Sequence, residues 1–198
     1  MPRPTTVVLA TRNPGKLTEF RALLEPSGCH VEGLPREAGP DPAETGATYA
    51  ENARIKALAA SHSTGFPVLA DDSGLEVFTL GRRPGVHSAR YLGAAASDAD
   101  RVRALLDELG RTAGPREARF VCALALAQAG SVLLEVEGEC RGIIAHEPRG
   151  DSGFGYDPIF LIPDLGRTSA ELSSNEKNAL SHRARAVAAL LEKLRPAP

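Results

Sequence analysis

The stretch Val68 to Leu75 reads VLADDSGL, a short apolar run that ends in two adjacent carboxylates and a Ser-Gly pair. The apolar run is typical of a buried strand. Adjacent carboxylates repel each other, so a buried strand has little reason to end on Asp71 and Asp72 unless a bound cation offsets their charge. An Asx turn that closes the strand is the simpler alternative. The stretch therefore predicts a strand that ends at either a cation site or a turn.

The chain before this stretch alternates strands with helices. Residues 6–10 (TVVLA) predict a buried strand, and apolar residues at helical spacing between Leu17 and Leu24 predict a helix after the turn TRNPGK. Pro14 near the start of that helix supports the assignment. A second helix is predicted over residues 48–62. Its expected buried face carries Tyr49, Ala53, Ala57 and Ala60, and its outer face carries Glu51, Asn52 and Lys56.

The chain after this stretch predicts a helix, three strands and a final helix. The first helix begins near Ser97 or Asp98, where an acidic first turn suits the helix dipole. Residues 120–127, 132–137 and 140–145 predict three strands joined by short glycine turns, as in an antiparallel meander. The last helix begins with NEKNALSHR, residues 175–183, and continues to about Leu194. This order predicts an α/β fold with one mixed sheet in a single domain, residues 1–198.

The composition restricts where the chain works and what it binds. A net charge of -2, from 23 basic and 25 acidic residues, gives no overall field to hold nucleic acid or an anionic membrane. No segment approaches the roughly 20 apolar residues of a membrane span, and the first apolar run is too short for a signal peptide. Cys29, Cys122 and Cys140 form no CxxC pair, which favours a reducing cytoplasm over a disulfide framework or a zinc site.

The turn TRNPGK, Thr11 to Lys16, combines groups that can hold phosphate: backbone N–H groups at a helix start, a side-chain amide and a lysine. It is not a Walker A loop, because Leu17 stands where that motif needs Ser or Thr. A capped helix start with a solvated lysine is the alternative. Glu44 could join Asp72 in an oxygen-rich site for magnesium, which typically binds one or two carboxylates plus substrate phosphates.

Further donors and an aromatic loop are spread along the chain. Ser73 and Gly74 would let the backbone approach a phosphate closely, and Lys56 and Arg90 are candidate phosphate ligands. The loop GFGYDP offers aromatic rings to stack on a planar base and a carboxylate to accept an N–H from it. Each of these groups also has a structural alternative, as a surface cation or as part of a tight turn with core aromatics.

Six motifs follow one another in a fixed order: TRNPGK, AETG with ENARIKA, LADDSG, PGVHSARY, GFGYDPIF and ELSSNEKNALSHR. In this order they resemble the inosine triphosphate pyrophosphatase family, also called the Ham1 or dITP/XTP pyrophosphatases. The resemblance runs from about Val7 to Leu194, essentially the whole chain. It implies a homodimeric, cytoplasmic α/β protein with a long central sheet flanked by helices and two lobes around an active-site cleft. It also implies magnesium-dependent hydrolysis of ITP, dITP and XTP to the monophosphate and pyrophosphate.

The resemblance also assigns site residues. It implies that Glu44 and Asp72 bind the metal and that Asp72 accepts the proton of the attacking water. The implied substrate contacts are Thr11, Arg12, Asn13, Pro14, Gly15, Lys16, Lys56, Ser73, Arg90, Phe154, Gly155, Tyr156, Asp157, Lys177, His182 and Arg183. The role of Asp71, as a second metal ligand or as structural support, is left open.

Three other functions are compatible with parts of this sequence. A nucleotide-binding module without turnover could use the same phosphate-binding groups, although Asp72 and Glu44 would then lack a purpose. A Maf-type pyrophosphatase would act on pyrimidine or modified nucleotides, whereas the FGYDP and SHR elements favour purines. A haloacid-dehalogenase-like phosphatase needs Asp-x-Asp at a strand end, and this chain has adjacent aspartates.

Overall fold

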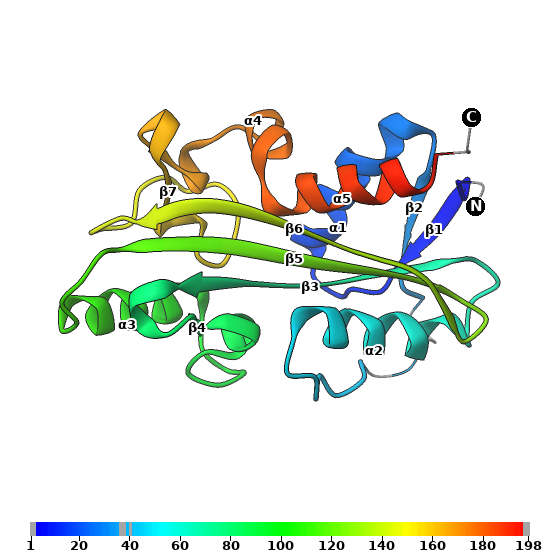
Figure 1. Cartoon of the computed structure of the whole chain (residues 1–198), viewed down its shortest axis with the longest axis horizontal. Helices are drawn as coiled ribbons and strands as arrows, with labels where there is room; N and C mark the ends of the chain where they lie inside the picture. Colours follow the sequence, from blue (N-terminus) through cyan, green and yellow to red (C-terminus); the bar gives the residue numbers. More distant parts are fainter. Residues whose placement is uncertain (1–2, 36–38, 40, 196–198) are drawn as a thin grey trace. The chain divides into compact units, whose positions relative to one another are not determined.

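The computed structural model describes residues 3–35, 39 and 41–195, so the ends of the predicted 1–198 domain lie outside the described residues. Figure 1 shows a mixed sheet with helices packed on it, which confirms the predicted α/β class. The strand order is β2-β1-β3-β5-β6-β7-β8, with β4 paired to β3. The chain divides into two compact units. Unit 1 contains Met1–Asp72, Cys122–Gly138 and His182–Pro198, and unit 2 contains Ser73–Val121 and Glu139–Ser181.

Unit 1 contains the parallel part of the sheet. Strand β1 (Thr6–Leu9) pairs in parallel with β2 (His30–Gly33) and with the start of β3 (Val68–Val77). Helices α1 (Pro14–Leu24) and α5 (His182–Lys193) lie on one face of this part of the sheet and α2 (Tyr49–Ser61) on the other (Figure 1). A short 3-10 turn, η1 (Glu25–Ser27), follows α1. The core is built around Val7, Leu9, Phe20, Leu69, Leu124, Leu126, Val187 and Leu190.

Unit 2 contains the antiparallel pairings. Strand β4 (Arg83–Pro84) pairs with the end of β3, and β7 (Phe160–Ile162) pairs with both β6 (Ser131–Ile144) and β8 (Arg167–Thr168). Its α-helices are α3 (Asp98–Gly110) and α4 (Ser174–Leu180). Its short turns are η3 (Phe78–Leu80), η4 (Gly85–Arg90), η5 (Asp157–Ile159), η6 (Pro163–Leu165) and η7 (Ser169–Glu171). The core is built around Leu75, Val77, Leu105, Ile144, Tyr156, Ile159 and Phe160.

Strand β3 does not end at the two aspartates, as the sequence predicted, but continues through Ser73 and Gly74 to Val77. It is the neighbouring strand β1 that ends near the aspartates. Strand β1 pairs with β3 only at Val68 and Leu69, and the last contact on this side is the Ala10 N–H to the Leu69 carbonyl at 2.8 Å. The aspartates therefore lie just past the carboxyl end of β1, where the chain turns away into TRNPGK. This is the position at which open α/β sheets commonly bind ligands.

The predicted meander of three strands is also wrong, because one long hairpin takes its place. Strand β5 (Glu117–Gln128) turns at Ala129 and Gly130, both at positive φ, into the single strand β6. Gly138 lies inside β6 and makes no turn. A Cβ atom there would lie 2.3 Å from the Ala186 nitrogen and 2.5 Å from the His182 carbonyl oxygen. The glycine is needed because helix α5 packs its backbone directly against this strand.

The predicted last helix is two helices, α4 and α5, separated at Ser181. Ser181 adopts an extended backbone, with φ of -66° and ψ of 160°. The chain thereby restarts a helix at His182, and Arg183 lies in its first turn. Helical spacing of apolar residues runs through the break, which explains why the sequence pattern did not reveal it.

Replacement of Gly138 by Ala should destabilise the protein. The added methyl group would collide with helix backbone, which cannot move aside as a flexible side chain can, so we expect a loss of at least about 1–3 kcal/mol in the free energy of unfolding. Urea denaturation measures the effect. The matched control is Gly110→Ala at the end of α3, where an added Cβ meets nothing within 4 Å. Equal stability of the two variants would contradict the proposed close packing.

Candidate functional site

The turn TRNPGK is held by its own side chains. Asn13 caps α1 by accepting hydrogen bonds from the Gly15 N–H at 2.8 Å and the Lys16 N–H at 3.2 Å, and Pro14 fills the first helical position. The Thr11 hydroxyl accepts the Asn13 N–H at 3.2 Å. Two of the backbone donors that the sequence offered to phosphate are thus bonded to Asn13. The Lys16 ammonium becomes the principal cationic group of the turn.

Asp71 is the buried partner of that ammonium. Its side chain is 1% exposed, and its Oδ2 lies 2.8 Å from Lys16 Nζ and 3.9 Å from Arg183 Nε. Burial alone would raise the pKa of Asp71, but Lys16, Arg183 and Lys56 outweigh burial and hold the pKa well below its usual range. Asp71 is therefore a permanent anion that fixes cationic side chains from α1 and α5. These ion pairs favour structural support as its role.

Asp72 contacts a different helix. Its Oδ2 accepts a hydrogen bond from Asn52 Nδ2 at 3.1 Å, and its Oδ1 lies 3.4 Å from Lys56 Nζ. Successive residues of a strand point to opposite faces of a sheet, so Asp71 turns toward α1 and α5 and Asp72 toward α2. The pleat thus gives each carboxylate its own partners.

Glu44 completes the group around Lys56. Glu44 Oε1 lies 2.8 Å from Lys56 Nζ, so the ammonium bridges Glu44 and Asp72. Burial opposes the charge of Lys56, but Asp71, Asp72 and Glu44 together raise its pKa. Burial raises the pKa of Asp72, and Glu44 adds to the rise, while Lys56 and Asn52 offset it in part. Asp72 is consequently a stronger base than an ordinary aspartate, and its neighbour Asp71 is a weaker one.

The donor set around Asp72 fits a magnesium ion. Glu44 and Asp72 supply hard carboxylate oxygens, and the ammonium between them shows that a cation is stabilised at this place. Within the described ranges, no three His, Cys, Asp or Glu side chains gather as a metal site. Two carboxylates nevertheless suffice for magnesium when substrate phosphates and water supply the other ligands.

The first turn of α5 adds two buried donors to unit 1. His182 and Arg183 are both buried, and Arg183 Nη1 lies 2.9 Å from Glu19 Oε2 on α1. Arg183 is thus held between Glu19 and Asp71. Arg12, another predicted contact, extends away from these groups: its guanidinium pairs with Asp41 at 3.0 Å, and its side chain is 43% exposed.

The predicted contacts in unit 2 centre on the aromatic loop, which we define as residues 153–157. Tyr156 is buried, its hydroxyl donates to the Ser88 carbonyl at 3.1 Å, and burial raises its pKa. It belongs to the core. Phe154, in contrast, is only half buried. It lines a cavity of about 610 Å³ between α3 and residues 148–158, together with Gly155, Asp98, Val102, Arg103 and Leu106.

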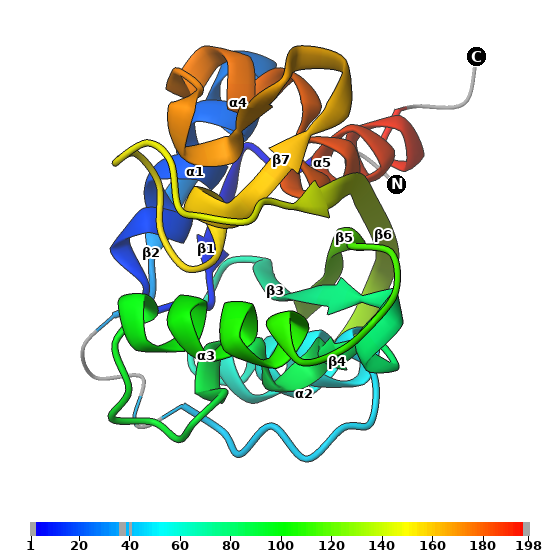
Figure 2. The same cartoon turned by 90° about the vertical axis from the view of Figure 1, so that its left-hand side faces the viewer.

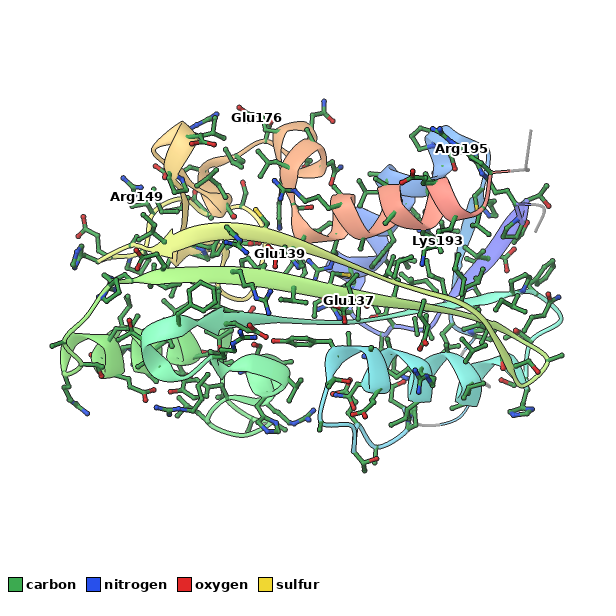
Figure 3. All side chains as sticks on the ribbon, in the orientation of Figure 1. Glu137, Glu139, Arg149, Glu176, Lys193 and Arg195 are labelled. Atoms are coloured by element: carbon green, nitrogen blue, oxygen red, sulfur yellow. The ribbon has the colours of Figure 1, made fainter. Side chains whose placement is uncertain are left out.

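Lys177 and Asp157 form a buried ion pair beside Phe154. Glu176 at the start of α4 (Figure 3) and Ser173 form a capping box, which fixes the helix turn that carries Lys177. Lys177 Nζ lies 2.6 Å from Asp157 Oδ2 and 5.2 Å from the centroid of the Phe154 ring. This arrangement places a hydrogen-bond donor next to an aromatic face. Ser73 and Arg90 are also in unit 2, on β3 and at the end of η4.

The sequence reasoning missed Asn52. It assigned Asn52 and Lys56 to the outer face of α2, but Asn52 is fully buried and the Lys56 side chain is only 13% exposed. A second contact confirms that Asn52 is an organising residue, because its Oδ1 accepts the Gly46 N–H at 2.8 Å beside Glu44. The available signal was their i, i+4 spacing, which places both side chains on one helix face.

Replacement of Asp71 by Asn should destabilise the protein strongly. The change removes the buried counter-charge of the partly exposed Lys16 and leaves the buried Arg183 with Glu19 alone, and we expect a loss of about 3–5 kcal/mol in the free energy of unfolding. Urea denaturation at neutral pH measures it. The control is Asp164→Asn, an exposed aspartate in η6 that should change stability by less than about 0.5 kcal/mol. Wild-type stability of Asp71→Asn would contradict a structural role for Asp71.

Known proteins resemble this chain along nearly its whole length. The profile of the Ham1 family matches residues 7–193. Proteins named dITP/XTP pyrophosphatase from Gloeobacter violaceus and Geobacillus kaustophilus are 54% and 53% identical over 185 and 188 residues; the matches cover 93% and 94% of this chain and 92% of each relative. A HAM1 protein from Coxiella burnetii has a solved structure with a TM-score of 0.86 and 44% identity, covering 96% of this chain and 98% of that one. The chain therefore belongs to the Ham1 family.

Proposed function

We propose that this protein hydrolyses ITP, dITP and XTP to the nucleoside monophosphate and pyrophosphate, and so removes deaminated purines from the nucleotide pool. The observation that carries the proposal is the environment of Asp72, a carboxylate with a raised pKa held by Asn52 and Lys56 beside Glu44. Relatives that are about half identical to this chain bear the name dITP/XTP pyrophosphatase, which supports the same activity.

Asp72 is the proposed general base. Its raised pKa suits it to take a proton from the water that attacks phosphorus. The hydrogen bond from Asn52 fixes the orientation of its carboxylate, which limits the reorganisation needed during proton transfer. Asp71 cannot share this role, because its pKa is low and its Oδ2 is bonded to Lys16.

The charges in unit 1 support a requirement for magnesium. The group contains three cations, Lys16, Lys56 and Arg183, and four carboxylates, Glu19, Glu44, Asp71 and Asp72, which leaves a net charge of -1. A group with this net charge does not attract a triphosphate. Glu44 and Asp72 would hold the magnesium ion, which when bound would supply the missing positive charge and lower the pKa of nearby water.

Lys16 and Lys56 are the proposed ligands of the phosphates. Each ammonium is already oriented by a carboxylate, at 2.8 Å in both ion pairs, so little side-chain entropy is lost when a phosphate oxygen binds. Both can stabilise the charge that develops on the pyrophosphate leaving group. The Asn13 side-chain amide lies at the same helix start and is a further donor.

The base is read by hydrogen bonds and stacking. Hypoxanthine and xanthine present an O6 acceptor and an N1–H donor, whereas adenine presents an N6 donor and a bare N1. In unit 2 the Lys177 ammonium beside the Phe154 ring suits O6, and in unit 1 His182 and Arg183 are further donors. Fixed donors of this kind can reject adenine by up to about 10⁴- to 10⁵-fold, because buried polar groups would be left unpaired.

We also propose that the protein is a cytoplasmic homodimer. Cys29, Cys122 and Cys140 are buried thiols, which fits a reducing compartment. Every helix in the described part of the chain is too short or too polar to cross a bilayer. The dimer is proposed from the family resemblance and is testable by light scattering.

Replacement of Asp72 by Asn should abolish turnover and preserve the fold. Loss of a positioned general base lowers the rate by about 10²- to 10⁴-fold, so we expect pyrophosphate release from ITP to fall by at least about 100-fold. Circular dichroism and the melting temperature should stay close to those of wild type. Asp164→Asn again serves as the control and should retain full activity. Wild-type turnover by Asp72→Asn would eliminate the assignment.

The substrate class is tested by a panel of ITP, XTP, GTP and ATP, each with magnesium and with EDTA. We expect pyrophosphate from ITP and XTP and hardly any from GTP or ATP. In EDTA we expect none, because without the metal ion the four carboxylates of the unit 1 group would repel the triphosphate. Pyrophosphate and orthophosphate are measured separately. Orthophosphate alone would indicate a phosphatase, and no product from any nucleotide would favour a binding module or a pyrimidine substrate.

A further inference from the structure

The aromatic loop is fixed by one hydrogen bond at each of three consecutive residues. The Phe154 N–H donates to Asp157 Oδ2 at 3.0 Å, the Gly155 N–H donates to Asp98 Oδ2 at 2.7 Å, and the Tyr156 hydroxyl donates to the Ser88 carbonyl. Asp157 and Tyr156 belong to the loop and are buried. Asp98 is an exposed residue of another element, α3, and the proposed chemistry gives it no role. Figure 2 shows this loop, in yellow, descending toward α3.

Asp98 is not needed to begin its helix. Ser97 and Asp100 cap α3 through a complete capping box: Ser97 Oγ accepts the Asp100 N–H, and Asp100 accepts the Ser97 N–H. Asp98 is instead oriented by Arg101, whose Nη1 lies 2.9 Å from Asp98 Oδ1 and whose side chain is 10% exposed. The other carboxylate oxygen is thereby directed at the Gly155 amide. A hydrogen bond to an ionised acceptor is stronger than one between neutral groups.

The loop needs such a restraint because glycines make it flexible. Gly153 and Gly155 have φ of 81° and 63°, a region that glycine enters readily and leaves readily. Gly153 is further restricted, since an added Cβ would lie 2.2 Å from Asp157 Oδ2. At Gly155 an added Cβ meets nothing within 4 Å, so the bond from Asp98 is its principal restraint. Phe154 lies between these two glycines.

We propose that Asp98 is a positioning residue for the substrate base. By holding the Gly155 amide, its carboxylate keeps the Phe154 ring in place on the wall of the 610 Å³ cavity that both Asp98 and Phe154 line. The ring is then already oriented for stacking before the nucleotide binds. The entropic cost of ordering the loop therefore does not reduce the binding free energy. The contribution to substrate binding rests on the proposed function, whereas the restraint on Gly155 does not.

The test compares Asp98→Ala, Asp98→Asn and the control Asp107→Ala, which removes an exposed carboxylate of the same helix outside its capping box and outside the cavity lining. We expect Asp98→Ala to raise the KM for ITP by about 5- to 20-fold, the effect of losing about one hydrogen bond at an exposed site, with kcat within about twofold of wild type. Asp98→Asn keeps an acceptor oxygen and should restore most of the KM. Asp107→Ala should leave KM within about twofold.

Two readouts separate this proposal from the proposed function. Hydrogen exchange of the Gly155 amide, followed by NMR, should accelerate in Asp98→Ala and not in Asp107→Ala. The Kd for a non-hydrolysable α,β-methylene analogue of ITP, measured by calorimetry with magnesium and with Asp72 unchanged, should rise with Asp98→Ala whether or not the wild type hydrolyses ITP. A wild type without pyrophosphate release would overturn only the proposed function. Unchanged exchange, or faster exchange with unchanged Kd and KM, would overturn the role of Asp98.

Discussion

The site in unit 1 depends on the buried charge of Asp71. A carboxylate that is 1% exposed is tolerated only with opposite charges close by, and Lys16 and Arg183 provide them from the first turns of two helices. The constraint acts in both directions, because the same pairs fix the directions in which α1 and α5 present their cations. The turn TRNPGK, the break at Ser181 and the glycine at position 138 then each serve a purpose. The turn and the break place the starts of α1 and α5 beside Asp71, and Gly138 allows α5 to pack closely on β6.

The pleat of β3 lets a second aspartate do different chemistry one residue away. Asp71 and Asp72 are identical side chains in the same strand, yet one pKa is lowered and the other raised. The difference arises because neighbouring strand residues face opposite sides of the sheet and so meet different helices. Three cations act on Asp71, whereas Asp72 shares Lys56 with Glu44. One carboxylate is thus committed to structure, and the other remains available as a base.

Local sequence patterns predicted the features that depend on a single segment. The starts of α1, α2 and α3 carry their own capping residues, Asn13, Thr48 and Ser97, and the sequence placed these starts correctly to within about three residues. The errors concern features set by a distant segment. Gly138 resembled a turn residue because its partner, the backbone of α5, lies more than forty positions away along the chain. Asn52 and Lys56 resembled solvent-facing polar residues because the carboxylates that bury them come from β3 and from Glu44.

Both units hold a lysine with a buried aspartate, and the consequences for a ligand differ. Lys16 and Asp71 are joined at 2.8 Å in unit 1, and Lys177 and Asp157 at 2.6 Å in unit 2. A close ion pair of this kind has no net charge, so it orients a hydrogen-bond donor but attracts an anion only weakly. The proposed triphosphate substrate carries several negative charges, so an oriented but neutral ion pair attracts it weakly, and the proposed magnesium ion would supply the attraction. The O6 atom of a purine is neutral, so an oriented donor is enough to distinguish it. A fixed donor bonds to the O6 acceptor and leaves the amino group of adenine without a partner. The neutrality of these lysine–aspartate pairs therefore explains why we expect phosphate binding to need a metal ion and base recognition to need none.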